Sequence, residues 1–570
     1  MVVSQLLQPA LDLASLVYMV ASILLTAYAL HAYGILAVLA RHGARSRLAV
    51  RKTEADGVRL LSGSGRWPAV VTQLPIYNEV NVASRVIRAA ASMDYPGEHT
   101  VQILDDSTDE TRDVVDQVAG ELRAAGKDVR VVRRQDREGF KAGALAHGMG
   151  LVDSEFLAVF DADFVPPKDF LTRTVPLLAG EAGVGFVQGR WTFLNERASV
   201  LTRAQGVGLD SHFVIEQSAR SSHPSMLMNF NGTAGIWRRE AIVAAGGWSA
   251  ATLTEDLDLS YRVQLVGWRG QYLNNLEVPG ELPSTFAAYK SQQFRWAKGS
   301  MQTAIRLLPI LLKSDLPVEA KLEAFFHLTH YAVHPLMLLV VALAPLLVIA
   351  GGGENWLPGV TAWALLLAAF APTIFYSVGQ ALLHGDWPRR LLRLPALTLA
   401  GMGVAASNTR AVWEAFLGKP SAFIRTPKRG ENETHRYQVR FPVPPEIEFG
   451  IGVYALWGFF EARQAGMAGM AQFCILAAAS FFYMGCWSLV EKYRQNVCEA
   501  DADKATGGVP LLTVGGLRGD GLEVLKGTIL DPEYDNRLSG SPSVCEGNRA
   551  GDSGEVLDGS QGGAEGLRVL

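Results

Sequence analysis

The sequence has 570 residues, of which 49% are hydrophobic and 19% charged, and its formal net charge is −4. This length exceeds that of a single domain, so we expect at least two folding units. The slight acidic excess argues against a nucleic-acid-binding protein, which needs a basic face for phosphate contacts. The four cysteines lie in the last fifth of the chain without a C-x-x-C pair. We therefore expect neither a disulfide framework nor a zinc site, and any metal should have carboxylate ligands.

The first long apolar run covers residues 13–40 and contains no Asp, Glu, Lys or Arg. It exceeds the roughly 20 residues that a helix needs to cross a bilayer. Its length and the lack of basic residues before it argue against a signal peptide. Five basic residues follow within 41–52, so the positive-inside rule places the next part of the chain in the cytosol.

Residues 66–315 are expected to form a cytosolic domain in which strands and helices alternate. The expected strands are 69–74, 100–104, 129–132 and 156–160. The expected helices are 78–93, 109–125 and 141–149. This alternation predicts an α/β domain with a mainly parallel, doubly wound sheet. In such sheets ligands bind at the carboxyl ends of the strands.

Two of the expected strands end in acidic residues. Asp161 and Asp163 follow the strand 156–160, and two carboxylates so spaced suit one hard divalent cation and its phosphate ligands. A loop turn is the competing interpretation, because Asp is common in turns. Asp106 ends the strand 100–104, where it either faces the same site or caps the next helix.

Four further segments carry side chains suited to sugar-phosphate chemistry. Glu255 and Asp256 open a helix after Thr254 and either supply a general base or belong to an ordinary helix start. Arg295 matches phosphate oxygens and Trp296 can stack on a sugar ring; the alternative is a core Trp beside a surface Arg.

Lys141 begins a helix and either contacts phosphate there or is a solvated lysine. Tyr77 follows the first strand and either stacks on a base or belongs to a capped turn.

The region 325–490 is expected to hold further membrane helices. The apolar runs are 332–350, 360–378 and 467–489, with a shorter and less secure one at 449–460. With 13–40, these runs predict about five spans. Residues 391–417 contain Arg393, Arg410 and Glu414 and are interpreted as an amphipathic interfacial helix. Residues 498–570 have the composition of a disordered cytosolic tail.

Nine segments together resemble glycosyltransferase family 2, and most closely its processive membrane branch of cellulose synthases and cellulose-synthase-like mannan and glucomannan synthases. In chain order they are QLPIYNE, LDDSTD, KAGAL, FDADF, FNGTAGIWRR, LTEDLDLSYR, ELPSTF, QQFRWAKGS and FIRTPKRG. Each is short, but the set in this order is very improbable by chance. The resemblance implies a GT-A type nucleotide-sugar-binding domain inserted in the membrane bundle.

The activity that the resemblance implies is inverting and processive. A hexose from GDP-mannose or UDP-glucose would be added to a growing β-1,4-mannan, glucomannan or glucan, which is exported across the membrane. The implied partners are the nucleotide-sugar donor, the polysaccharide acceptor and membrane lipids. The protein would be integral to the cell membrane or an endomembrane, with its catalytic domain in the cytosol.

The resemblance also implies roles for single residues. Asp256 would be the general base with Glu255 beside it, while Asp163 and Asp161 would bind Mg²⁺ or Mn²⁺. The residues implied in nucleotide-sugar binding are Tyr77, Glu79, Asp106, Lys141, Asp161 and Arg295. The residues implied in acceptor binding are Asn231, Gln292, Gln293 and Trp296. Residues 423–428, within a gating region of about 391–430, look like the loop that closes over the nucleotide in this family.

Two other functions compete with this interpretation. A non-processive ceramide or polyprenyl-phosphate sugar transferase shares part of the motif set. A transporter or membrane scaffold with a vestigial domain is the second, and the intact acidic residues argue against it.

Overall fold

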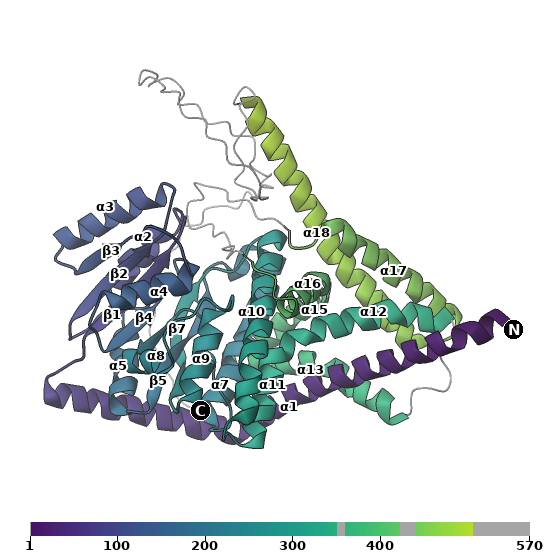
Figure 1. Cartoon of the computed structure of the whole chain (residues 1–570), viewed down its shortest axis with the longest axis horizontal. Coiled ribbons are helices and arrows are strands. Elements are labelled where there is room, and N and C mark those ends of the chain that lie inside the picture. Colours follow the sequence, from purple (N-terminus) through teal and green to yellow (C-terminus); the bar gives the residue numbers. More distant parts are fainter. Residues whose placement is uncertain (1, 350–358, 422–440, 506–570) are drawn as a thin grey trace, which may run out of the picture. The chain divides into compact units, whose positions relative to one another are not determined.

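The computed structural model describes residues 2–349, 359–421 and 441–505 (Figure 1). The chain divides into a unit of residues 1–492 and a second unit of residues 493–570. All elements discussed below belong to the first unit, apart from the end of the last helix.

One seven-stranded sheet has the order β3-β2-β1-β4-β6-β5-β7. The strands are β1 Val70–Ile76, β2 His99–Asp105, β3 Val129–Val132, β4 Phe156–Val159, β5 Val184–Phe193, β6 Gly235–Arg238 and β7 Arg269–Gly280. Strand β6 runs antiparallel to β4 and β5, and the other four pairings are parallel. The predicted mainly parallel sheet is therefore confirmed. Because β1 lies between β2 and β4, the strand order reverses there, and the carboxyl ends of these strands share one edge.

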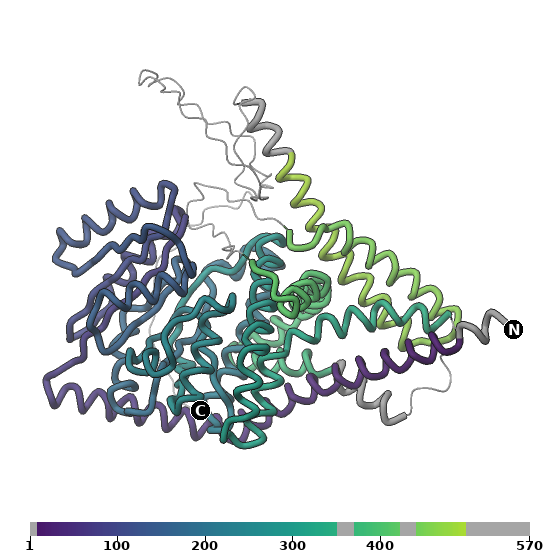
Figure 2. The backbone as a smooth tube through the Cα atoms, in the orientation of Figure 1, coloured from purple at the N-terminus to yellow at the C-terminus, as the bar shows by residue number. Residues whose placement is uncertain are grey.

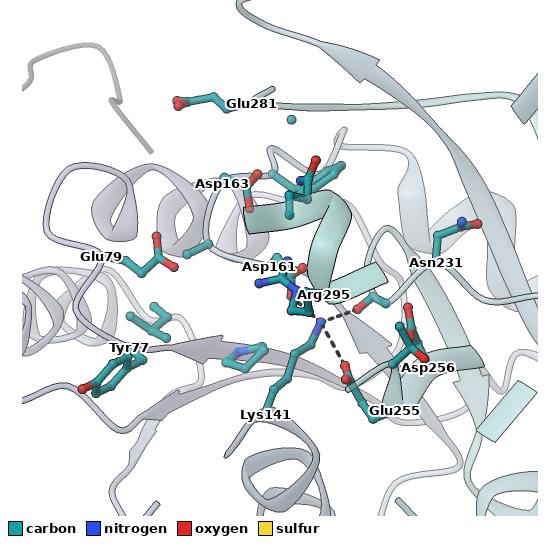
Figure 3. A pocket seen from close by; sticks show the side chains of 18 of the residues that line it. Tyr77, Glu79, Lys141, Asp161, Asp163, Asn231, Glu255, Asp256, Glu281 and Arg295 are labelled. Atoms are coloured by element: carbon teal, nitrogen blue, oxygen red, sulfur yellow. Dashed lines mark hydrogen bonds and ion pairs between the residues drawn. The ribbon is translucent and has the colours of Figure 1, made fainter. Parts of the chain in front are cut away.

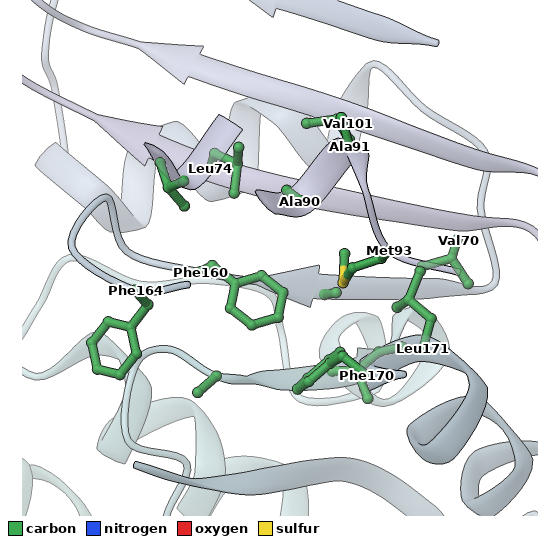
Figure 4. Close-up of a cluster of buried hydrophobic side chains, with 14 of the residues drawn as sticks. Val70, Leu74, Ala90, Ala91, Met93, Val101, Phe160, Phe164, Phe170 and Leu171 are labelled. Carbon is green, nitrogen blue, oxygen red and sulfur yellow. The ribbon is translucent and has the colours of Figure 1, made fainter. Parts of the chain in front are cut away.

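Helices cover both faces of this sheet, which explains why its central strands are almost continuously apolar. On one face, α2 Ala83–Ala91, α3 Thr111–Ala124 and α5 Phe170–Gly180 pack around Leu74 and Phe160 (Figure 4). On the other face lie α4 Phe140–Gly150, α8 Arg239–Ala244 and α9 Glu255–Leu265.

Helix α2 begins five residues later than the predicted helix 78–93. Asn78 adopts a left-handed backbone conformation, with φ of 53°, which asparagine tolerates better than most residues. Its Oδ1 accepts a hydrogen bond from Thr108 N (2.8 Å), and its own N–H donates to Ser107 Oγ (3.0 Å). The residues after β1 therefore form a loop that is tied to the loop after β2.

Helices make up the remainder of the first unit. Helix α10, Phe286–Lys313, stands between the sheet domain and the green helices in Figure 2 and contacts both α9 and α16. The helices that follow include α11 Val318–Thr329, α12 Val333–Ile349, α13 Gly359–Leu383, α15 Leu394–Gly403, α16 Ala405–Phe416, α17 Pro445–Gln464 and α18 Ala468–Ala505.

Three helices of the described chain are long and apolar enough to cross a membrane. They are Gln8–Ser64 within α1 (Val2–Ser64), Val318–Ile349 and Ala468–Asn496. They contain nearly all of the expected spans 13–40, 332–350 and 467–489. The expected span 360–378 falls in α13, whose described apolar part is the shorter helix Phe370–Leu383. The expected span 449–460 falls in α17, and the count of five stays a prediction.

Two expected boundaries differ from the structure. The expected interfacial helix 391–417 is broken into α15 and α16 at Gly403 and Val404. Glycine disfavours helix, and a Cβ on Gly403 would lie 2.6 Å from Ser480 O of α18. Helix α18 continues to Ala505, past the expected tail boundary at 498, through a segment rich in the strong helix former alanine. The expected gating loop 423–428 and tail residues 506–570 lie outside the described residues.

Candidate active site

One pocket at the carboxyl edge of the sheet collects the expected site residues (Figure 3). Those that line it are Tyr77, Glu79, Asp106, Lys141, Asp161, Asp163, Asn231, Glu255, Asp256, Gln292, Arg295 and Trp296. Gln293 is not among the described residues that line this pocket, although its neighbour Gln292 on α10 is. The sequence motifs thus converge from strand ends and helix starts that are far apart in the chain.

The pocket is strongly acidic. Its walls carry seven carboxylates, those of Glu79, Asp106, Asp161, Asp163, Glu255, Asp256 and Glu281. The basic side chains in the same walls are Arg137, Lys141 and Arg295. Carboxylates crowded into one crevice repel one another unless cations enter it. The pocket therefore favours a cationic ligand or a metal-bound one.

Lys141 occupies the middle of the pocket, at the start of α4. Its Nζ lies 2.6 Å from Asp161 Oδ1 and 3.5 Å from Glu255 Oε1, and it donates to Gly232 O at 2.8 Å. Burial alone would lower the pKa of Lys141, but Asp161 and Glu255 raise it above its ordinary value. Lys141 is thus a permanent cation that links three segments, which excludes the solvated-lysine interpretation.

Asp256 stands in the first turn of α9. Its Oδ1 accepts the N–H of Leu257 at 2.9 Å. Burial, followed by the neighbouring Glu255 charge, raises the pKa of Asp256 to about 7. Gly232 permits its close approach, since it has φ of +80° and an added Cβ would lie 2.8 Å from Asp256 Oδ2. A carboxyl group with such a pKa can accept a proton near neutral pH.

Helix α10 is held tightly against the turn that precedes α9. A Cβ on Gly299 would lie 2.6 Å from Thr254 Cγ2, and Gln302 Oε1 accepts the N–H of Leu253 at 3.0 Å. Thr254 precedes α9 as expected, but its hydroxyl lies 3.3 Å from Thr303 Oγ1 instead of capping the helix. This packing fixes α10 relative to Asp256.

The same packing brings Arg295 and Trp296 of α10 to the pocket. Burial lowers the pKa of Arg295, while the charges of Glu255 and Asp161 oppose that effect. Trp296 also packs against a buried cluster that includes Met301 and Tyr331. Trp296 is therefore both part of a hydrophobic core, as one interpretation expected, and part of the pocket wall, as the other expected.

Asp161 and Asp163 fit a divalent cation that also has phosphate and water ligands. Among the residues that the structure describes, no group of three or more His, Cys, Asp or Glu is arranged to hold a metal ion. Mg²⁺ in particular binds through one or two carboxylates together with substrate phosphates. The Asp161 side chain is 34% exposed, and the nearby Asp163 charge helps to raise its pKa beyond the effect of burial. An added cation would relieve that repulsion.

The sequence motifs did not single out three residues in or beside the pocket: Arg137 and Glu281 line it, and Arg134 contacts its lining residue Asp106. The Arg137 guanidinium lies 3.2 Å from the centroid of the Tyr77 ring, where a stacked base was expected. Arg134 binds Asp106 through both carboxylate oxygens, at 3.0 and 2.5 Å. Glu281 pairs with Arg85 at 2.6 Å. Glu281 lies within the ELPSTF segment, which was the only sequence signal for it; Arg137 and Arg134 had none.

The known proteins that resemble this chain are glycosyltransferases. The profile of the family described as "Glycosyltransferase like family 2" matches residues 68–299. Glucomannan 4-beta-mannosyltransferase 9 of Arabidopsis thaliana is 33% identical over 70% of this chain and 77% of its own length. Probable glucomannan 4-beta-mannosyltransferase 9 of Oryza sativa subsp. japonica is 32% identical over 75% of this chain and 83% of its own.

Among solved structures, a mannosyltransferase from Pyrobaculum calidifontis in complex with GDP-Man and Mn²⁺ is similar over 70% of this chain and all of its own. Its sequence identity is 18% and its TM-score 0.44.

Proposed function

Because the chain belongs to glycosyltransferase family 2, in the cellulose-synthase-like branch, and is thus a hexosyltransferase, we propose that it builds a β-1,4-linked mannan or glucomannan from GDP-mannose. Mannose is preferred to glucose because the two relatives described above are named as mannosyltransferases. The polymer grows processively and leaves through the membrane helices, and the catalytic domain faces the cytosol.

The observation that carries this proposal is the position of Asp256. Its carboxyl group has a pKa of about 7 and lies in the same pocket as the Asp161–Lys141 pair and Arg295. In Figure 3, Tyr77 and Glu79 lie on one side of Lys141, and Asn231 and Asp256 lie on the other. A donor on the first side and an acceptor on the second would meet above Lys141.

The reaction is a single displacement. The acceptor hydroxyl oxygen attacks the anomeric carbon of the donor, its proton passes to Asp256, and the bond from that carbon to the diphosphate oxygen breaks. Arg295 neutralises charge on the leaving diphosphate, and Lys141 holds Asp161 and Glu255 in place. Attack from the face opposite the leaving group converts an α-linked donor into a β-linked product.

A Mg²⁺ or Mn²⁺ ion held by Asp161 and Asp163 supplies additional positive charge at the diphosphate when it is bound. Asn231, Gln292 and Trp296 bind the acceptor end; Gln293 is left without a role, since it does not line the pocket.

The substitution Asp256→Asn tests the assignment of the base. The amide has nearly the same shape but cannot take a proton, so sugar transfer should fall by at least about 100-fold. GDP-mannose affinity, measured by calorimetry on the full-length protein in detergent, should change little. Transfer within a few fold of the wild-type rate would reject Asp256 as the base. Asp258→Asn is not a suitable control, because Asp258 binds Arg262 and Arg306; the exposed Asp113 of α3 serves instead.

A further inference from the structure

A π-helical turn lies directly behind the proposed acceptor side of the pocket. It covers His212–Gln217 (η2) and connects α6 Val200–Ser211 with α7 Ser218–Ser222. Hydrogen bonds in a π-helix join residues five apart, so His212 and Gln217 lie one turn from each other. In an α-helix, with 3.6 residues per turn, residues five apart point in different directions. The wider turn therefore lets both side chains reach one target.

That target is the side-chain amide of Asn231. Gln217 Nε2 donates to Asn231 Oδ1 and to Asn229 O, the latter at 2.9 Å. Asn231 Nδ2 lies 3.1 Å from His212 Nε2. Because Oδ1 is the acceptor toward Gln217, Nδ2 is the donor toward His212, and His212 Nε2 accepts. Both ends of the Asn231 amide are thus held by one turn of helix.

A carboxylate fixes the histidine in turn. His212 Nδ1 lies 2.8 Å from Glu216 Oε2, so the ring donates from Nδ1 while it accepts at Nε2. Burial alone would raise the pKa of Glu216, but the hydrogen bond from His212 and the charge of Arg220 oppose that effect and favour the charged carboxylate. The chain of hydrogen bonds therefore runs in one direction, from Asn231 through His212 to Glu216.

We propose that His212, Glu216 and Gln217 are positioning residues that clamp the Asn231 amide, so that its second N–H is aimed at a hydroxyl group of the acceptor sugar. Asn231 lines the pocket and the three clamp residues do not, so they act through Asn231. The acceptor role of Asn231 rests on the proposed function. Because the amide is already held in place before the sugar binds, binding does not have the entropic cost of ordering a free side chain.

A double-mutant cycle between His212 and Asn231 tests the clamp. The full-length protein in detergent would be assayed with GDP-mannose and mannotetraose as the acceptor. His212→Leu and Asn231→Ala should each lower kcat/KM for mannotetraose by about tenfold, as loss of one such hydrogen bond does. The double variant should be no slower than Asn231→Ala alone, because neighbours that act as a unit are not additive. The KM for GDP-mannose should stay within about twofold of the wild-type value.

Two further variants separate this role from a general structural one. His212→Gln should recover part of the lost acceptor activity, since an amide oxygen can accept the Asn231 N–H. If His212→Leu does not fold, Gln217→Met, which removes the donor to Asn231 Oδ1, takes its place in the cycle. His147→Leu changes an exposed histidine of α4 and should leave kcat/KM unchanged.

The clamp would be overturned if the double variant lost the product of the two single effects on kcat/KM. It would also be overturned if the KM for GDP-mannose rose as much as kcat/KM for mannotetraose fell. If the wild-type protein makes no β-mannan at all, the proposed function fails. If it makes β-mannan and the two effects multiply, only the clamp fails.

Discussion

Lys141 and Asp161 form an ion pair, with 2.6 Å between Nζ and Oδ1, in the middle of a pocket that carries seven carboxylates. The two residues come from the start of α4 and from the loop after β4, and Lys141 also binds Gly232 O of a third segment. This lysine therefore offsets carboxylate repulsion and fixes the spacing between the proposed donor and acceptor sides of the pocket.

Replacing Lys141 by Met should impair the donor side most. The uncharged side chain leaves Asp161 and Glu255 without their shared cation, and losing one member of a buried charge pair is costly. We therefore expect kcat/KM for GDP-mannose to fall by about 100-fold. Steady-state kinetics on purified protein provides the measurement. The exposed Lys127 offers a matched control, since Lys127→Met should keep the wild-type rate. Equal activity of the two variants would contradict a central role for Lys141.

The rate of transfer should depend on pH through Asp256. A base works only when it is unprotonated, and the pKa of Asp256 is raised from its ordinary value to about 7. The value of kcat/KM should therefore fall about tenfold per pH unit below 7 and level off above it. A profile of initial rates at saturating metal shows this directly. A rate that stays constant down to about pH 5 would mean that the pKa of the base is not raised.

Removal of the metal should abolish transfer, and Asp163 should control how tightly the metal is held. After treatment with EDTA, Mg²⁺ or Mn²⁺ should restore activity, and Asp163→Asn should raise the metal concentration for half-maximal rate by about tenfold or more. Asp169→Asn serves as the control, because the Asp169 side chain is largely exposed. An unchanged metal requirement in Asp163→Asn would remove this residue from the metal site.

Gly299 should tolerate no side chain. A Cβ there would lie 2.6 Å from Thr254, so Gly299→Ala pushes α10 away from the turn that leads to Asp256. Overpacking of this kind costs roughly 1–3 kcal/mol of folding free energy, and misplaced Arg295 should lower kcat further.

Melting temperature and kcat together measure the effect of Gly299→Ala. Gly120→Ala is the control: it lies on α3, where an added Cβ meets nothing within 4 Å among the described residues, and alanine there should stabilise the helix slightly. A Gly299→Ala enzyme with normal kcat would show that α10 need not fit so closely.

Much of the pocket was predictable because its residues occupy strand ends and helix starts. Asp161 follows β4 and Lys141 opens α4, and parallel strands bring such positions to one edge of the sheet. Asp256 was predictable from its motif, since it occupies the first turn of a helix.

Features that depend on distant packing were not predictable. Arg137 stacks on Tyr77, which lies in a loop 60 positions earlier in the chain. An arginine or a tyrosine in a loop does not by itself indicate such a contact. The π-helical turn at His212 was not predicted, because its side chains contact Asn231, which lies 14 to 19 positions further along the chain. The left-handed backbone conformation of Asn78 was not predicted either, and helix α2 begins at Ala83 and not at residue 78 as predicted.

Product analysis tests the central claim most directly. Full-length protein in detergent, supplied with Mg²⁺ or Mn²⁺, would be given radiolabelled GDP-mannose, UDP-glucose or GDP-glucose in separate reactions. The account predicts a long polymer from GDP-mannose that β-mannanase cleaves and cellulase does not. A product limited to one sugar on a lipid, or a polymer made only from UDP-glucose and cut by cellulase, would contradict it.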